Sequence, residues 1–89
     1  MSVERDEDAI RLVGGCGVED AEPLAVLCRA APGLPVDLGG AGPLHTAVVQ
    51  VLLELAPPLR GVPADPFAAA FVVPALERAR AARGGAGEV

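Results

Sequence analysis

Three residue types in this chain could carry out chemistry, namely cysteine, histidine and aspartate. Cys16, His45 and Asp37 together offer the groups of a nucleophilic triad, and the lone histidine with the cysteines could ligate zinc. A triad needs its base beside the nucleophile, and structural zinc needs four ligands, usually in paired spacings. The sequence shows neither arrangement. We therefore interpret His45 as a surface histidine at a helix start, and we expect no catalytic residue, metal or cofactor.

Two glycine clusters could bind a phosphate, since each precedes a predicted helix. The first, at 14–17, is followed by Glu19, Asp20 and Glu22, which would repel an anion, so we expect an ordinary tight turn there. The second, at 39–42, is better placed, because no acidic residue lies in the first two turns of the next helix. The backbone donors of that helix would point near Thr46. A plain turn, with Thr46 as an ordinary helix residue, is the alternative.

Composition limits both the size and the partners of the protein. A chain of 89 residues forms one domain, and with only two aromatic residues, Phe67 and Phe71, its core must be aliphatic. The formal net charge of −5 argues against nucleic acid and against an acidic membrane surface, both of which attract a basic face.

Cysteine usage and the apolar segments predict a reduced, cytoplasmic protein. Cys16 and Cys28 have neither a metal-ligand nor a redox-pair spacing, and no signal peptide is recognisable. The longest apolar helix is interrupted by Gln50 and Glu54, well short of the ~20 residues that span a bilayer. We therefore expect no transmembrane segment.

The order of the predicted elements favours an α/β fold in which a small sheet packs against helices. Residues 1–8 form a charged lead-in that could include an edge strand at Val3, residues 9–83 form the single domain, and residues 84–89 form a flexible tail. Glycine, proline and apolar periodicity predict strands at Ala9–Val13 and Leu34–Leu38, joined by a helix near Glu19–Ala31. We expect these two strands to be neighbours.

The second helix is apolar around most of its circumference, so we expect it to be packed on two sides. Thr46, Gln50 and Glu54 form its only polar line. The residues expected to be buried between the sheet and a helix carrying Phe67 and Phe71 are Val48, Val51, Leu52 and Leu55. Residues 59–63 form a connector too rich in proline for a central strand. Pro74 predicts a kink or break at Val73, followed by a helix over 75–83.

The stretch 34–53 resembles the centre of a STAS domain, the fold shared by anti-sigma-factor antagonists and the cytoplasmic tails of sulfate transporters. In that family an apolar strand with an aspartate leads through a turn of small residues to Asp-Ser or Asp-Thr at a helix start. Here Asp37 precedes a glycine-rich turn, and His45-Thr46 opens the helix. The resemblance covers about Ile10–Pro58. Because residues 59–63 are too short to supply the later strands, it implies a trimmed version with fewer strands.

The resemblance implies a non-enzymatic signalling module that switches between protein partners, such as a kinase or an anti-sigma-like regulator. It places the phosphoacceptor at Thr46, although the aspartate that precedes the acceptor in the family is a histidine here. The expected partner-binding residues are Gly39, Gly40, Gly42, His45, Thr46 and Gln50. Two alternatives stay open: an unphosphorylated accessory subunit docked on a membrane transporter or larger enzyme, and a small hydrolase using Cys16 or His45. The helix around Arg78, Arg80 and Arg83 is the next candidate surface.

Overall fold

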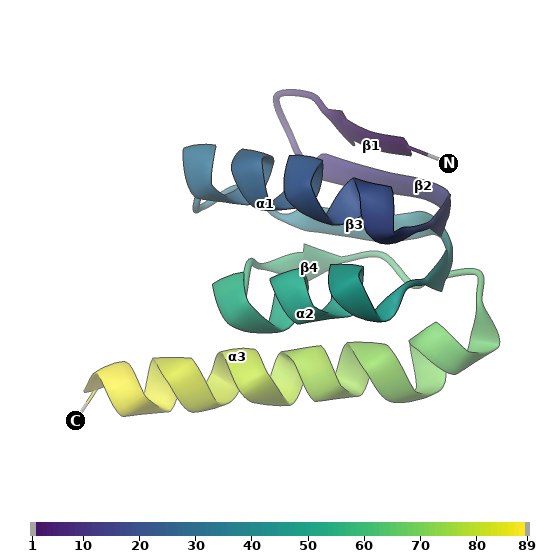
Figure 1. Ribbon diagram of the computed structural model, residues 1–89. Helices are drawn as coiled ribbons and strands as arrows, with labels where there is room; N and C mark the ends of the chain where they lie inside the picture. Colours follow the sequence, from purple (N-terminus) through teal and green to yellow (C-terminus); the bar gives the residue numbers. More distant parts are fainter. Residues whose placement is uncertain (1, 89) are drawn as a thin grey trace.

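The computed structural model describes residues 2–88, and the side chains of residues 3–83 (Figure 1). It is an α/β fold with a four-stranded mixed sheet. In chain order the elements are β1 (Ser2–Arg5), β2 (Ile10–Cys16), the 3₁₀ helix η1 (Val18–Asp20), α1 (Ala21–Ala30), β3 (Val36–Leu44), α2 (Thr46–Leu55), β4 (Leu59–Arg60), the π-helix η2 (Ala68–Val72) and α3 (Val73–Glu88).

The sheet has the strand order β1-β2-β3-β4, with β1 antiparallel to β2 and the other three strands parallel. The predicted neighbours Ala9–Val13 and Leu34–Leu38 are confirmed, because Ile10 pairs with Val36 in β2 and β3, and α1 joins the two strands. The connections β2–α1–β3 and β3–α2–β4 each move one strand across the sheet in the same direction. Because both connections have the same hand, their helices lie on the same face of the sheet, and Figure 1 shows α1 and α2 side by side there.

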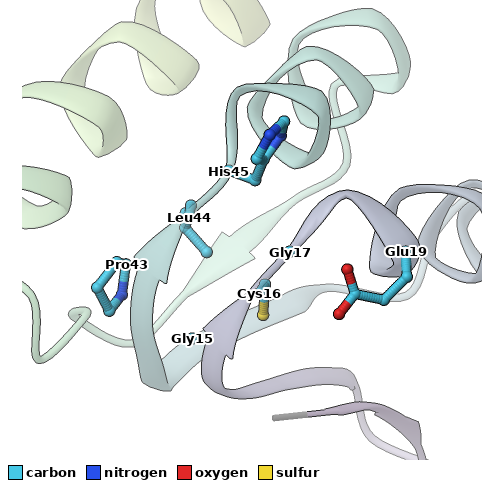
Figure 2. Close-up of a pocket in the computed structure, with 7 residues that line it drawn as sticks. All are labelled: Gly15, Cys16, Gly17, Glu19, Pro43, Leu44 and His45. Atoms are coloured by element: carbon cyan, nitrogen blue, oxygen red, sulfur yellow. The ribbon is translucent and has the colours of Figure 1, made fainter.

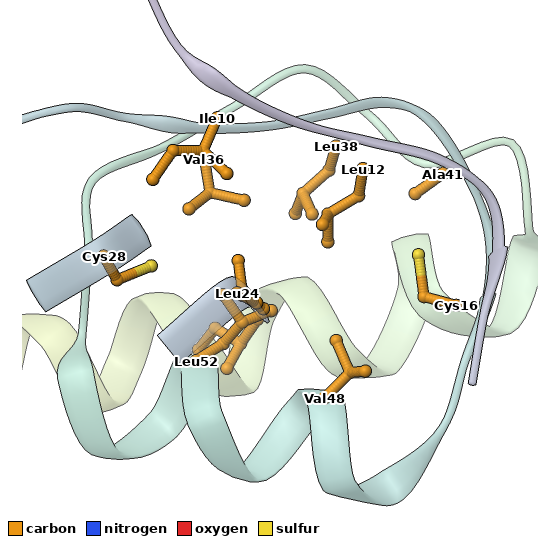
Figure 3. Close-up of a cluster of buried hydrophobic side chains, with 11 residues drawn as sticks. Ile10, Leu12, Cys16, Leu24, Cys28, Val36, Leu38, Ala41, Val48 and Leu52 are labelled. Atoms are coloured by element: carbon orange, nitrogen blue, oxygen red, sulfur yellow. The ribbon is translucent and has the colours of Figure 1, made fainter. Parts of the chain in front are cut away.

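The core lies between that face of the sheet and the helices (Figure 3). Alternate residues of β2 and β3 point into it, while α1 and α2 each contribute one apolar stripe. The fully buried large side chains are Ile10, Leu12, Leu24, Val36, Leu38, Val48 and Leu52. The predicted burial of α2 is therefore confirmed for Val48 and Leu52, whereas Val51 and Leu55 are only partly buried.

The predicted glycine turn at 39–42 is wrong, because β3 continues through it to Leu44. The register shifts twice against β2. Two residues of β3 oppose one of β2 between Asp37 and Gly40, and again between Ala41 and Leu44. Glycine is common at such bulges. At Gly42 it is also needed sterically, because an added Cβ would lie 3.2 Å from the backbone nitrogen of Gly15.

The two edges of the sheet also differ from the expected pattern. The charged lead-in contains β1, which pairs with β2 through Val3 and Leu12, so the strand considered near Val3 is present. The proline-rich connector contains β4, which is only Leu59–Arg60. It ends at Arg60, and the φ of 79° at Gly61 takes the chain out of the strand conformation. A proline-rich segment can supply such a strand because the strand is short and lies at the end of the hydrogen-bonded order.

Pro74 does not break the last helix, and the predicted packing of the phenylalanines on α2 is wrong. Pro74 has no N–H, and the turn before it is widened so that the Val73 N–H donates to the Ala68 carbonyl, five residues back. The inserted residue brings Ala68 and Leu76 onto one face, and these two are the buried residues of the segment. Phe67 and Phe71 are each 65% exposed instead.

α3 runs alongside α2 and continues to Glu88, beyond the predicted helix end at Arg83 (Figure 1). Residues 84–88 of the predicted flexible tail are thus helical, and Val89 lies outside the described residues. None of the helices over residues 2–88 is both long enough and apolar enough to cross a bilayer.

Candidate functional site

A shallow hollow of about 510 Å³ lies at the carboxyl ends of β2 and β3 (Figure 2). Open α/β sheets bind ligands at this edge, because the strands end there and the next helices begin. A hydrogen bond of 2.9 Å from the His45 N–H to the Cys16 carbonyl joins the two strand ends. The residues around the hollow are Gly15, Cys16, Gly17, Glu19, Pro43, Leu44 and His45.

The Cys16 thiol faces the core rather than the hollow. Only 3% of the residue is exposed, and its Sγ lies 3.6 Å from the Gly14 carbonyl oxygen, to which it donates. Burial raises the pKa of this thiol, and the nearby Asp20 carboxylate raises it further. The thiol is therefore protonated at neutral pH, and a protonated thiol is a poor nucleophile. Burial also raises the pKa of Cys28, which lies in the same core.

His45 is the N-cap of α2. Its Nδ1 accepts a hydrogen bond of 2.9 Å from the Ala47 N–H, which assigns the proton of the neutral imidazole to Nε2. The ring and the Cys16 sulfur point apart (Figure 2). Asp37 lies at the other end of β3, roughly 25 Å away at a strand rise of about 3.3 Å per residue. The structure therefore does not bring the three candidate triad residues together.

The turn after β2 is filled by the chain's own carboxylates. Asp20 accepts the Gly17 N–H at 2.8 Å, and it is the buried charged residue of the described chain. The Glu19 carboxylate lies so close to Gly17 that an added Cβ there would come within 2.5 Å of its Oε1. A phosphate would meet two negative charges at this helix start. The tight turn expected at 14–17 is wrong, because β2 continues through Gly14 and Gly15 to Cys16, and only Gly17 lies outside the strand.

No cluster of three or more histidine, cysteine or acidic side chains occurs within residues 2–88 that could hold a metal ion. Asp20 instead accepts a hydrogen bond from a backbone N–H, and Asp37 accepts one from a backbone N–H and pairs with Arg11. In the described part of the chain the donor set therefore offers nothing that fits a metal cofactor.

The structure divides the expected partner-binding residues between two sides of the sheet. His45, Thr46 and Gln50 are exposed at the start of α2, on the side of the helices. Gly39 and Gly40 are exposed in the middle of β3, and an added Cβ on Gly39 would lie 3.1 Å from Asp37 Oδ1, on the opposite face. Gly42 is half-buried between them. The proposed phosphoacceptor, Thr46, is the first residue of α2.

An aromatic pair that was not predicted as a surface feature is exposed at the same end of the molecule. The rings of Phe67 and Phe71 are 5.3 Å apart between centroids. Phe67 immediately precedes η2 and Phe71 lies within it. η2 lies with η1 and the start of α2 at the carboxyl end of β3 (Figure 1). Val18 and Val62 are also exposed, at 61% and 74%. The sequence contained one indication of this exposure. Phe67 and Leu76 are nine positions apart, and that spacing places two residues on opposite faces of a regular helix.

Comparison with protein-family models, with curated proteins and with solved structures finds no match to this chain.

Proposed function

We propose that this chain is a protein-binding module with no catalysis of its own, and that it binds its partner through the carboxyl end of the sheet. The observation that supports the proposal is the exposed pair Phe67 and Phe71. These are the only aromatic residues of the chain, and both lie at the surface in mutual contact. Aromatic side chains dominate the energetics of protein interfaces, and a contiguous exposed apolar patch usually marks one.

The magnitude of the available burial supports a binding role. With about 200 Å² per phenylalanine side chain, the exposed two-thirds of both rings amounts to roughly 260 Å². At about 25 cal/mol per Å², complete burial contributes up to ~6 kcal/mol before the costs of association. Ala68, which lies between the two rings in sequence, is buried and fixes the helix that presents them.

The finer proposal is that binding is regulated, as the resemblance to STAS domains implies, in a cytoplasmic signalling pathway. Thr46 is exposed at the first turn of α2, at the same end of the molecule as the aromatic pair. A phosphate there adds about two negative charges where the helix dipole tolerates them. It would repel an acidic partner docked at this end. The glycine turn of the STAS pattern is absent here, because residues 39–42 belong to β3, but the hydroxyl at the helix start is present at Thr46.

The alternative is a permanently bound accessory subunit of a membrane transporter or a larger enzyme. The apolar character of the exposed pair favours it, because obligate interfaces are more apolar than transient ones. Phosphorylation has no role in that case. The two proposals share the binding surface and differ in whether Thr46 controls it.

Photocrosslinking in the native cell tests the shared surface. A photoreactive phenylalanine analogue at position 67 or 71 should give a crosslinked partner that mass spectrometry identifies. The same analogue at Val26, an exposed apolar residue of α1, is the matched control. Crosslinks from position 26 but not from 67 or 71 would place the binding surface elsewhere.

Variants of Thr46 then separate the two proposals. In the regulated module, Thr46→Glu should weaken binding of the identified partner, and Thr46→Ala should bind but no longer respond to a kinase. In the permanent subunit, wild type and both variants should bind equally. Calorimetric affinities for the three forms decide between them.

A further inference from the structure

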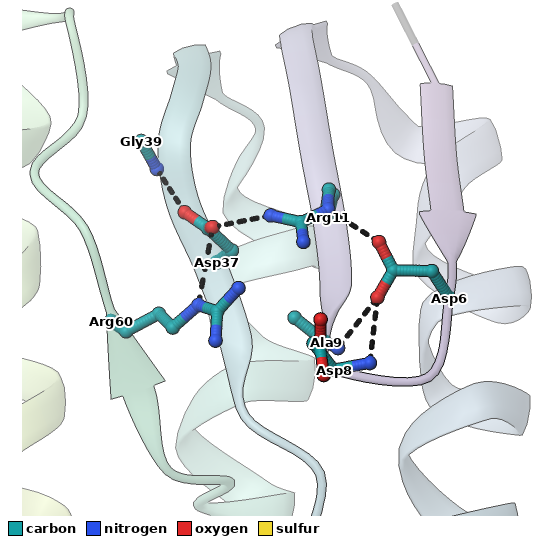
Figure 4. A network of polar contacts seen from close by, with 7 residues as sticks. All are labelled: Asp6, Asp8, Ala9, Arg11, Asp37, Gly39 and Arg60. Atoms are coloured by element: carbon teal, nitrogen blue, oxygen red, sulfur yellow. Dashed lines mark hydrogen bonds and ion pairs between the residues drawn. The ribbon is translucent and has the colours of Figure 1, made fainter.

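The face of the sheet opposite the helices is uncovered, as seen in Figure 4, where the helices lie behind the strands. Three of its four strands are parallel, and parallel strands are usually covered on both faces. The exposed positions are nevertheless not random surface residues. They form one ordered row of charges beside a flat, nearly side-chain-free area.

The row consists of four charged residues in register across all four strands. Glu4 of β1 pairs with Arg11 of β2, Arg11 pairs with Asp37 of β3, and Asp37 pairs with Arg60 of β4. Their neighbours along the strands, such as Leu12 and Val36, point into the core, so the alternation of a strand places the charges outside. The signs therefore alternate from one edge of the sheet to the other.

Hydrogen bonds hold the centre of this charge row in place. Asp37 Oδ2 accepts from Arg11 Nη1 at 2.7 Å and from Arg60 Nε at 3.3 Å, while its Oδ1 accepts from the Gly39 N–H at 2.8 Å. The Gly39 N–H is the largest cause of the lowered pKa of Asp37, followed by Arg60. Arg11 Nε also donates to Asp6 at 2.8 Å. The contact of Arg60 with Asp37 engages its Nε, which leaves the Nη groups of this half-exposed side chain for another acceptor.

Beyond the charge row, the face is flat. The exposed residues of β2 and β3 beyond the row are small or apolar, namely Val13, Gly15, Gly39, Gly40 and Pro43. An added Cβ on Gly40 would lie 3.9 Å from Cγ2 of Val13, which is exposed on this face. Because Gly40 has no side chain, the space beside Val13 on the uncovered face is empty. A second flat surface could approach the backbone closely at this place.

We propose that this face associates with the same face of a second copy of the chain. A twofold axis parallel to the strands, between β2 and β3, places the reversed row of one copy over that of the other. Glu4 then lies opposite Arg60 of the second copy, and Arg11 lies opposite Asp37 of the second copy. All four contacts between the two rows join opposite charges, so the row is complementary to itself.

The sign pattern also selects this orientation. A twofold axis along the row would place each charge opposite its own copy, and all four contacts would be repulsive. An axis parallel to the strands keeps the mean strand directions of the two sheets aligned, which is the common packing of face-to-face sheets. The orientation is therefore fixed by the charges and allowed by the geometry of the sheet.

The size of the face sets the expected strength. The four strands have 4, 7, 9 and 2 residues. With about 3.3 Å per residue and about 4.8 Å between strands, they give a face of roughly 350 Å² per copy. A standard interface contributes about 800 Å² per partner. We therefore expect a weak, concentration-dependent dimer with a dissociation constant in the micromolar range or above.

Charge reversal at the two ends of the row tests the proposal. In one chain Glu4 and Arg60 lie on opposite edge strands, about 14 Å apart at three strand spacings, so they meet only in the dimer. Glu4→Arg and Arg60→Glu should each weaken association about tenfold or more, as measured by sedimentation equilibrium. A mixture of the two variants should form a heterodimer in which both end contacts are attractive again. The double variant should associate like wild type.

Two further measurements keep the result decisive. In the first, NMR spectra of the wild-type protein are recorded during dilution, so no variant has to fold. The amide resonances that shift should come from this face, including those of Arg11, Val13 and Gly40. Phe67→Ser with Phe71→Ser should leave the association unchanged, which separates this dimer from contacts of the aromatic pair. A wild-type protein that stays monomeric at millimolar concentration, or a variant mixture that does not regain association, would overturn the proposal.

Discussion

Truncation of Leu52 and of Phe67 to alanine should have very different effects on stability. Leu52 is 1% exposed and lies in the core among residues of the sheet and the helices, whereas Phe67 is 65% exposed. Leu52→Ala removes a buried side chain and leaves a cavity, so it should cost about 2–5 kcal/mol in free energy of unfolding. Phe67→Ala removes mostly solvated surface and should cost less than ~1 kcal/mol.

The measurement is urea unfolding followed by far-ultraviolet circular dichroism at several protein concentrations. The free energy of unfolding of each variant is compared with that of wild type, at an unchanged dependence on denaturant. The concentration series separates any contribution of self-association. A cost of about 3–5 kcal/mol for Phe67→Ala, as for a buried phenylalanine, would refute the placement of η2 and of the exposed pair. A cost below ~0.5 kcal/mol for Leu52→Ala would refute the placement of α2 against the sheet.

Three further predictions concern the open face, the thiols and the bulge. Asp37→Asn should lower the stability of the protein at neutral pH and make that stability less sensitive to acid. The fold lowers the pKa of Asp37, so the ionised carboxylate stabilises the protein above its ordinary pKa of 3.8, and this contribution is lost as the pH falls through the folded value. Thermal melts from pH 7 to 2 measure both effects. Cys16 and Cys28 should react with a thiol reagent far more slowly in the native protein than in urea, because both are buried and protonated; fast native reaction would contradict this. Gly42→Ala should destabilise the protein more than Gly33→Ala, because an added Cβ lies 3.2 Å from Gly15 at the first position and contacts nothing at the second, and equal melting temperatures would contradict the bulge geometry.

The local elements with strong periodicity could be predicted from the sequence. The strand, helix and strand from Ile10 to Leu38 follow from apolar runs separated by glycine, proline and acidic helix-start residues. The burial of Val48 and Leu52 follows from the apolar stripe of α2. These features depend on neighbours within a few residues, which the sequence contains.

The features that were missed depend on register or on an irregular turn. A glycine cluster such as 39–42 carries the same local signal in a turn as in a bulged strand, and only the pairing with β2 distinguishes them. The exposure of Phe67 follows from one extra residue in η2, which shifts every later residue of the helix. The charge row joins Glu4 to Arg60, and sequence periodicity does not encode which strands become neighbours.

The central claim is that the exposed aromatic pair binds a partner protein, and calorimetric titration with the partner identified by crosslinking tests it most directly. The double variant Phe67→Ser with Phe71→Ser should bind at least about a hundredfold more weakly than wild type, since loss of two buried aromatic anchors typically costs several kcal/mol. Val26→Ser, the matched exposed control, should bind like wild type. Equal affinities of wild type and the double phenylalanine variant, with both proteins folded, would contradict the account.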